Sequence, residues 1–333
     1  MKHAAKYGYT LDQERIQCRL CPKQCKLREG QFGFCKTRVN EGGELFTVIY
    51  AEVTGCGVDP IEKKPLYHYY PGQGILSLGT KGCNLGCVFC QNWQIAQRAD
   101  APSQRLMPAE AVALAVQHES FGIAYTYTEP LIWYEYVLDT AMLARERGLK
   151  NVLVTNGFIC EEPLAELVPH IDAANIDIKS FDPAFYRRLC KAELEPVVRM
   201  VEQVRPHWHV ELTHLIVPHK DEAEILDDVR RMCDWIAGAL GRDTPLHFSR
   251  YFPHHKLKLP ATDLGLLKRA REIALERLEY VYLGNIHADQ GAHTQCPGCG
   301  ALLIERLGYR TTVRGLDAGA CTACGRTINI VGA

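Results

Sequence analysis

Short apolar runs alternate with amphipathic segments through the middle of the chain, from about residue 74 to residue 285. The runs have the length and β-branched or aromatic composition of strands, and the segments between them have the apolar spacing of helices. Helix boundaries are readable too, because Pro108 stands in the first turn of one helical segment and Gly148 follows the end of the next. The candidate strands are residues 74–79, 123–128, 151–156, 174–179, 209–217, 246–252 and 280–285.

Strand followed by helix, repeated roughly six times, predicts an α/β fold with a parallel sheet and crossover helices, either closed into a barrel or open. In barrels of this kind functional groups gather where the strands end. Polar residues stand at those points in this chain: Glu129, Asn156, Asp177, Lys179, His214, His247, Arg250, Asn285 and His287. Their repetition in one architecture predicts a lined cavity.

Composition and charge narrow the class of protein. The 333 residues are 47% hydrophobic and 23% charged, with a formal net charge of −1, which gives no overall electrostatic attraction to nucleic acid or to an anionic membrane. The first residues lack the apolar run of a signal peptide, and no stretch of 18 apolar residues predicts a membrane span. We therefore expect a cytoplasmic protein that has no membrane partner, and we do not expect it to bind nucleic acid.

Fifteen cysteines are many for such a chain, and in a reducing compartment they are better interpreted as ligands or core residues than as disulfides. Three of them, Cys83, Cys87 and Cys90, form a C-x3-C-x2-C motif just after the first predicted strand. Three thiolates are able to hold zinc with an open position, or three irons of a [4Fe–4S] cluster. We interpret the scattered Cys160, Cys190 and Cys233 as structural.

This motif, in a loop after the first strand of a β/α repeat, resembles that of the radical SAM superfamily. In that family three cysteines bind a [4Fe–4S] cluster, and S-adenosylmethionine (SAM) chelates the remaining iron through its amino and carboxylate groups. The resemblance implies both cofactors, a partial (β/α)6 barrel, and catalytic roles for Cys83, Cys87 and Cys90. Phe89, the aromatic residue before the third cysteine, matches the family residue that lies by the adenine.

Further segments resemble SAM-binding positions of the family. The segment "YTYTEP" (125–130) stands where the family has a Gly-Gly-Glu-Pro-type segment, although both glycines are absent, which implies that Glu129 accepts hydrogen bonds from the SAM ammonium. The segment "VTNG" (154–157) resembles the ribose-contacting end of the third strand and implies a cofactor-binding role for Asn156.

Two later positions resemble glycyl-radical-enzyme activases such as pyruvate formate-lyase activating enzyme. "DIK" at 177–179 is similar to their Asp-x-Lys pair, which implies that Lys179 contacts the SAM carboxylate and that Asp177 helps to hold a monovalent cation. His247 resembles the SAM-contacting histidine of the activases.

The resemblance is closer still to one subfamily. "DPIEKKPLYHYYPG" (59–72), "CQNW" (90–93) and "PLHFSRYFP" (245–253) resemble the AmmeMemoRadiSam system radical SAM enzyme, over roughly residues 15 to 287. It implies an activating-enzyme-like oxidoreductase that abstracts hydrogen from a protein or peptide, with a reductant such as flavodoxin or ferredoxin. The alternatives are radical SAM modification of a small molecule, and a non-enzymatic iron–sulfur or zinc protein for electron transfer or binding.

The other two cysteine groups are four-ligand sets, which favour structural sites. The spacing C-x2-C-x21-C-x2-C near the end is that of a zinc ribbon, formed by Cys296, Cys299, Cys321 and Cys324. The N-terminal set is spaced C-x2-C-x3-C-x9-C and comprises Cys18, Cys21, Cys25 and Cys35. Zinc and an auxiliary [4Fe–4S] cluster are both compatible with it, and ligand chemistry alone favours zinc slightly. Cys56 is an alternative ligand or a free thiol.

These groups predict three domains. Residues 1–72 form a cysteine-rich N-terminal domain with its own metal site, residues 73–290 form the barrel, and residues 291–333 form a zinc-ribbon-like module. The ribbon has only a slight excess of positive charge, which is too small to indicate a nucleic-acid site. We therefore interpret the ribbon as a folding staple or a docking surface.

Overall fold

A parallel sheet forms the centre of the protein, as the sequence predicts. The computed structural model describes residues 2–12, 14–98, 100–286 and 291–333. Its parallel strands are β9 (Gly74–Gly79), β11 (Gly122–Thr126), β12 (Lys150–Thr155), β13 (Ala173–Asp177), β14 (His209–Ile216), β15 (Leu246–Arg250) and β16 (Val281–Gly284), which neighbour one another in that order. Strand β8 (Gly55–Pro60) pairs antiparallel with β9 at one edge. Because β8 and β16 stand at opposite edges of this sheet, the α/β barrel is partial.

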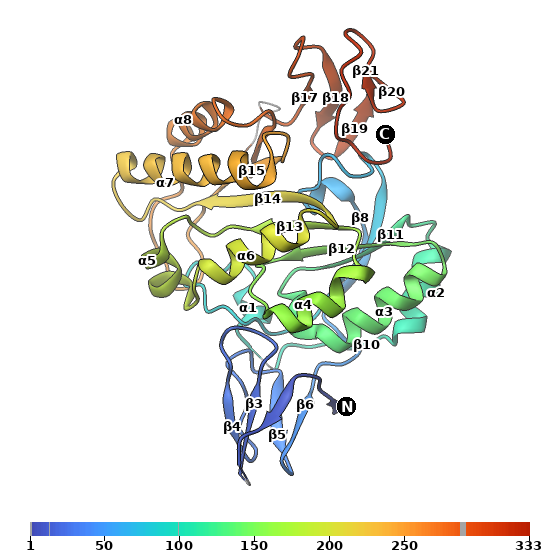
Figure 1. Ribbon diagram of the computed structural model, residues 1–333, viewed down its shortest axis with the longest axis vertical. Helices are drawn as coiled ribbons and strands as arrows, with labels where there is room; N and C mark the ends of the chain where they lie inside the picture. The colour runs from blue at the N-terminus through green and yellow to red at the C-terminus, as the bar shows by residue number, and fades with distance from the viewer. Residues whose placement is uncertain (1, 13, 99, 287–290) are drawn as a thin grey trace.

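Helices cover the outer face of the sheet (Figure 1). The longer ones are α2 (Pro108–Gln117), α3 (Tyr134–Glu146), α4 (Glu161–Leu167), α6 (Glu195–Val204), α7 (Glu222–Trp235) and α8 (Leu264–Leu275). Shorter turns are α1 (Trp93–Ala96), α5 (Pro183–Phe185), the 3-10 helices η1 (Ile61–Lys63), η2 (Pro130–Trp133) and η3 (Val168–His170), and the π-helical η4 (Tyr186–Cys190) and η5 (Ile236–Leu240). The predicted boundaries at Pro108 and Gly148 are confirmed, since α2 begins at the first and α3 ends just before the second.

The N-terminal region is all β. It contains the sheets β1-β6-β5 and β2-β3-β4, while β7 pairs with β10. These strands are β1 (His3–Ala4), β2 (Gly8–Thr10), β3 (Arg15–Cys18), β4 (Lys26–Arg28), β5 (Arg38–Glu41), β6 (Glu44–Thr47), β7 (Glu52–Val53) and β10 (Gln104–Arg105). A buried ion pair between Arg38 and Glu135 of α3 joins this region to the barrel, and Trp133 Nε1 donates to the carbonyl of Ile49 at 2.7 Å.

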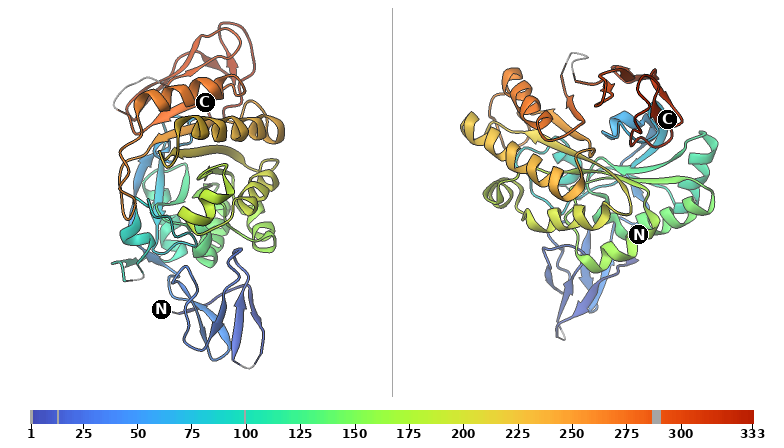
Figure 2. Two further views of the ribbon diagram at one scale, coloured as in Figure 1. Left: turned by 90° about the vertical axis from the view of Figure 1, so that its left-hand side faces the viewer. Right: turned by 45° about the horizontal axis from the view of Figure 1, so that its top comes forward.

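The C-terminal module comprises β17 (Thr294–Gln295), β18 (Leu302–Leu307), β19 (Arg310–Val313), β20 (Leu316–Asp317) and β21 (Ala320–Cys321). It lies at the opposite end of the molecule from the N-terminal strands (Figure 2). Arg306 of β18 is fully buried and donates to the carbonyl of Tyr67 at 2.6 Å and to Thr294 Oγ1 at 2.8 Å. Its guanidinium lies 4.2 Å from the Tyr67 ring centroid. The module is therefore bound to the barrel through a desolvated arginine. The expected domain boundary at residue 290 lies outside the described residues.

Polar side chains fill the end of the barrel at which the strands begin. Glu211 is fully buried and accepts from the backbone N–H groups of Tyr67 (3.0 Å) and His68 (2.7 Å), and from ring nitrogens of His209 (3.1 Å) and His247 (2.7 Å). We call Glu211, His68, His209 and His247 the basal cluster. It joins β14 and β15 to the segment that follows β8, because the His68 and Tyr67 amides come from that segment.

Among the described residues, no helix combines the length and the apolar character that crossing a membrane requires.

Candidate active site

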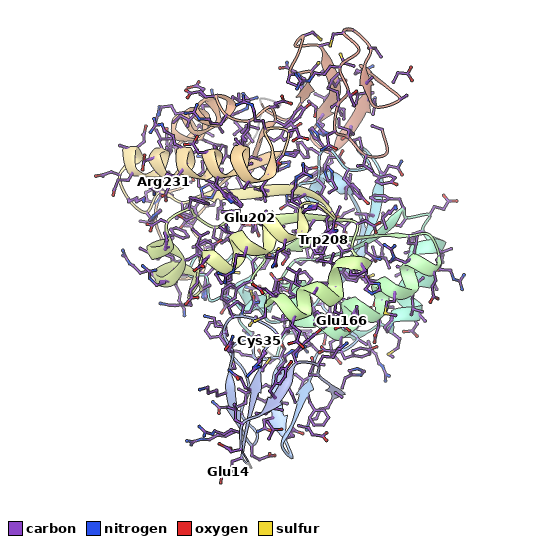
Figure 3. All side chains as sticks on the ribbon, viewed as in Figure 1. Glu14, Cys35, Glu166, Glu202, Trp208 and Arg231 are labelled. Atoms are coloured by element: carbon purple, nitrogen blue, oxygen red, sulfur yellow. The ribbon has the colours of Figure 1, made fainter. Side chains whose placement is uncertain are left out.

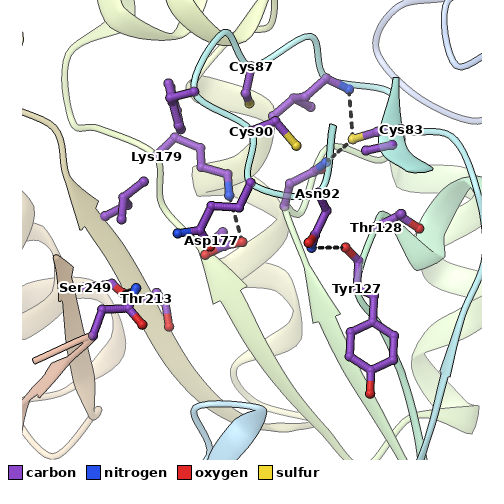
Figure 4. Close-up of a pocket in the computed structure, with 17 residues that line it drawn as sticks. Cys83, Cys87, Cys90, Asn92, Tyr127, Thr128, Asp177, Lys179, Thr213 and Ser249 are labelled. Carbon is purple, nitrogen blue, oxygen red and sulfur yellow. Dashed lines mark hydrogen bonds and ion pairs between the residues drawn. The ribbon is translucent and has the colours of Figure 1, made fainter. Parts of the chain in front are cut away.

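A cavity opens at the end of the barrel where the parallel strands finish, as the sequence predicts (Figure 4). It has a volume of about 860 Å³, including the space open to solvent. The residues that line it are Cys83, Leu85, Cys87, Phe89, Cys90, Gln91, Asn92, Ala96, Tyr127, Thr128, Asn156, Asp177, Lys179, Thr213, Leu215, Ser249 and Asn285. All three cysteines of the C-x3-C-x2-C motif therefore face one space, together with polar residues from several strand ends.

The loop that carries the three thiols is fixed by close packing. Gly82 has φ +91°, and a Cβ there would stand 2.8 Å from the carbonyl oxygen of Cys35, so glycine is required for both conformation and space. Cys83 Sγ accepts from the backbone N–H of Leu85 at 3.4 Å and from Asn156 Nδ2 at 3.6 Å. Donors aimed at a sulfur stabilise a thiolate, the form that binds metal.

Burial makes these sulfurs poor thiolates without a cation. It raises the pKa of Cys83 well above its usual value and that of Cys90 to about 11. The pKa of Cys87 is also raised well above its usual value, first by a hydrogen bond with Cys190 and then by burial. Three desolvated thiols around one cavity are a donor set suited to a soft, positively charged group such as an iron–sulfur cluster.

Cys190 is the neighbour that sequence reasoning missed. It lies in η4, fully buried, and its carbonyl accepts from the backbone N–H of Gly86 at 2.8 Å, which brings its thiol to Cys87. The two cysteines are about a hundred residues apart, so spacing gave no signal for this contact.

Asp177 and Lys179 face the cavity from the end of β13. Lys179 Nζ lies 2.7 Å from Asp177 Oδ2, and both side chains are partly exposed. Burial lowers the pKa of Lys179, but Asp177 and Cys87 raise it by more, so the lysine is positively charged. The pair thus places a fixed cation beside the three thiols (Figure 4).

Other predicted site residues divide into two groups. Asn156 and Phe89 line the cavity, and the Phe89 ring packs against Phe185 at 5.6 Å between centroids. The polar strand-end residues outside the cavity lining are Glu129, His214, His247 and Arg250, and His287 lies outside the described residues.

The Glu129 side chain is buried in the protein interior and does not line the cavity. Its carboxylate accepts from Thr155 Oγ1 (2.6 Å) and from the backbone N–H groups of Asn156 (2.8 Å) and Leu131 (2.9 Å). Burial raises the pKa of Glu129 to about 7 despite these bonds. The side chain therefore ties the loop after β11 to the end of β12, and Thr128 occupies the cavity wall next to it.

The two outer cysteine groups differ in spacing. Cys296 Sγ lies 3.6 Å from Cys324 Sγ, and Cys299 Sγ lies 3.7 Å from Cys321 Sγ. All four of these sulfurs lie within 4.8 Å of one another, so this group is able to bind a metal ion. The N-terminal Cys18, Cys21, Cys25 and Cys35 line a separate small hollow. Cys56 is exposed on β8 and lines neither space.

Comparison with known proteins decides the family. A sequence profile of the Radical SAM superfamily matches residues 77–232, which include the three-cysteine loop and Asp177–Lys179. This chain belongs to the radical SAM superfamily. Radical SAM enzymes catalyse radical chemistry with a [4Fe–4S] cluster and SAM, and the thiols around the cavity fit that cluster.

Similar proteins extend the comparison. An uncharacterized protein of Methanocaldococcus jannaschii is 44% identical over 98% of this chain and 99% of its own length. The pyruvate formate-lyase-activating enzyme of Clostridium pasteurianum is 23% identical over 47% of this chain and 66% of its own length. The structure of Streptococcus suis SuiB bound to S-adenosylmethionine matches with a TM-score of 0.51 at 13% identity, covering 68% of this chain and 53% of SuiB. The first relative matches all three parts of the chain, and SuiB shows the shared fold.

Proposed function

We propose that this protein reductively cleaves SAM at a [4Fe–4S] cluster held by Cys83, Cys87 and Cys90, and abstracts a hydrogen atom from a protein or peptide substrate. The observation that carries the proposal is the meeting of three thiols and the Asp177–Lys179 pair in one open cavity. The bound cluster and SAM together supply an electron and a 5′-deoxyadenosyl radical.

The side chains around the cavity bind and orient the cofactor in this proposal. Lys179 is held by Asp177 and pairs with the SAM carboxylate. The Asp177 carboxylate also helps to hold the expected monovalent cation. Phe89 packs by the adenine, and Asn156 contacts the ribose from the end of β12.

Glu129 and His247 support SAM binding indirectly in this proposal. Glu129 has three donors within the protein, and His247 Nε2 is bonded to Glu211, so both side chains already join neighbouring segments around the cavity. We assign them the positioning of the loop after β11 and of β15.

A protein or peptide substrate, with flavodoxin or ferredoxin as reductant, is supported by two similarities. One is the partial match to an activating enzyme, and the other is the SuiB fold, which has a solved complex with the precursor peptide SuiA. The matches to "DPIEKKPLYHYYPG" and "PLHFSRYFP" support placement in the AmmeMemoRadiSam subfamily of activase-like oxidoreductases.

The direct test is 5′-deoxyadenosine formation by the anaerobically reconstituted protein with SAM and dithionite. Extract from cells grown in deuterated medium, separated by a size-selective filter, then supplies candidate substrates. Deuterium in 5′-deoxyadenosine from the retained fraction supports a protein or peptide substrate. Label from the filtrate alone would replace it with a small molecule, and no 5′-deoxyadenosine would exclude the radical reaction.

Lys179→Met should weaken SAM binding by about tenfold, or roughly 1.4 kcal/mol, because it removes the cation nearest the proposed SAM carboxylate. Equilibrium dialysis of labelled SAM against the reconstituted protein measures the effect. Lys268→Met, on the exposed face of α8, is the matched control and should leave affinity unchanged. Equal affinities for the two variants would contradict the role of Lys179.

Zinc is the metal that we propose for the C-terminal four-cysteine group. Tetrahedral coordination at about 2.3 Å places thiolate sulfurs about 3.8 Å apart, close to the 3.6 and 3.7 Å between paired sulfurs. Because β18 of this module supplies the buried Arg306, metal loss should loosen the barrel end that the module covers.

Cys324→Ser should therefore release about one zinc per chain and lower the thermal midpoint by at least about 5 °C. Elemental analysis and calorimetry measure the two effects. Cys56→Ser, on exposed β8, is the control and should retain both zinc and midpoint. Full zinc content in Cys324→Ser would refute this ligand.

A further inference from the structure

The four N-terminal cysteines all border one internal space. Cys18, Cys21, Cys25 and Cys35 all line one hollow of about 330 Å³, including space open to solvent, together with Leu20, Lys23, Gly33, Phe34, Arg38 and Ile132. Four thiols around one hollow are a donor set for a single tetrahedral ion or for a small inorganic cluster, and the surroundings of the sulfurs favour one of the two.

Sulfur spacing separates the three cysteine sets of this protein. The C-terminal four lie within 4.8 Å of one another, the arrangement for one tetrahedral ion. Within the described residues, no three sulfurs of the N-terminal set lie that close together, and neither do those of Cys83, Cys87 and Cys90. A cubane cluster binds each thiolate at a different iron, so its ligands must stand apart. Among the described residues, the N-terminal set and the radical SAM cysteines thus both lack the compact arrangement of the C-terminal four.

Donors also surround the hollow. Cys25 Sγ accepts from the backbone N–H of Phe34 at 3.4 Å, and Cys35 Sγ accepts from Thr37 Oγ1 at 3.1 Å. Arg38 lines the hollow with 1% of its surface exposed, and its Nε has no acceptor among the described residues. A buried donor without a partner is costly, and a thiolate or an inorganic sulfide would satisfy it.

Residues that line the hollow contact the loop that carries Cys83, Cys87 and Cys90. Ile132 lines the hollow and lies 3.3 Å from the Cβ position of Gly82, next to Cys83 in the chain. The carbonyl of Cys35 contacts the same glycine, and the Phe34 ring reaches within 3.2 Å of the Cβ position of Gly86. Figure 3 places Cys35 where the N-terminal strands meet the barrel. Two metal centres in these sites would therefore be neighbours.

We propose that Cys18, Cys21, Cys25 and Cys35 bind a [4Fe–4S] cluster that passes electrons to the radical SAM site. The cluster accepts one electron from an external low-potential reductant and gives that electron to the cluster at Cys83, Cys87 and Cys90, returning to its oxidised state. The destination of the electron rests on the function proposed above, whereas the identity of the metal group does not.

Metal analysis after anaerobic reconstitution tests the identity. The wild type should contain about eight irons and one zinc per chain, and the triple variant Cys83→Ala/Cys87→Ala/Cys90→Ala should keep about four irons and a [4Fe–4S] electron paramagnetic resonance (EPR) signal after reduction. About four irons and two zincs in the wild type, or no iron in the triple variant that retains its thermal transition, would overturn the proposal.

EPR also tests the electron path. Neighbouring reduced clusters couple magnetically, so the N-terminal signal should relax faster in the wild type than in the triple variant. Identical relaxation would overturn the electron transfer. The two proposals fail separately: 5′-deoxyadenosine formed by a protein with four irons contradicts only the N-terminal cluster. A protein with eight irons that forms none contradicts only the proposed function.

Discussion

Cys87→Ala is expected to reduce 5′-deoxyadenosine formation to the level without protein, whereas Cys190→Ala is expected to reduce it by less than about tenfold. The two thiols are hydrogen-bonded neighbours, but only Cys87 lines the cavity with the other cysteines of the motif. Removing Cys87 removes a proposed cluster ligand that lines the cavity. Removing Cys190 changes only the surroundings of that ligand.

Iron content and product should be measured together in both variants. Cys87→Ala should lose the iron of the radical SAM site, and Cys190→Ala should retain it. Since the variants remove similar buried thiols, a general effect of packing would lower both equally. Equal losses would refute the distinction, and retained activity in Cys87→Ala would refute its role as a ligand.

Local patterns predicted the barrel well because they depend on neighbours in sequence. The seven parallel strands, β9 and β11 to β16, each begin and end within a few residues of the predicted runs. Strand β8 was not predicted, since "GCGVDP" contains two glycines and a proline and has little of the composition typical of strands. It becomes a strand because it pairs along the whole of β9.

The candidate site was predicted less completely because the sequence does not show how far a strand residue lies from the cavity along the barrel axis. His247 pairs with Thr213 and Tyr282 across the sheet, and Ser249, two residues further along β15, lines the cavity. Side chains two residues apart on a strand point to the same face of the sheet, but their positions along the strand differ by about 6.6 Å. His247 is therefore on the inner face yet one layer below the cavity, where it bonds to Glu211.

Long-range contacts were beyond any local pattern. The contact of Tyr67 with Arg306 joins segments 239 residues apart, and that of Cys87 with Cys190 depends on how η4 packs under the cysteine loop. The C-terminal cysteines predicted a metal site, but nothing in their spacing indicated that the module lies where the strands begin.

Glu211→Gln is expected to lower the free energy of unfolding by about 3–5 kcal/mol, measured by urea denaturation at pH 7. The buried carboxylate of Glu211 accepts from four donors: the N–H groups of Tyr67 and His68 and the rings of His209 and His247. A glutamine of the same shape would turn an NH₂ group toward two of them and leave buried donors unpaired. Glu195→Gln is the control, because that side chain is 79% exposed and its ion pair with Arg199 should contribute less than about 1 kcal/mol.

The stability difference between wild type and Glu211→Gln should depend on pH in a defined direction. Burial raises the pKa of Glu211, but hydrogen bonds from His209 and His247 outweigh that effect and hold the pKa well below the usual 4.5. The unfolded chain therefore takes up this proton at higher pH than the folded protein, and the wild type loses the contribution as the pH falls below about 4.5. The difference should shrink as the pH falls below about 4.5. A difference under about 1 kcal/mol at pH 7, or one that grows as the pH falls below about 4.5, would show that the basal cluster does not stabilise the barrel through an ionised Glu211.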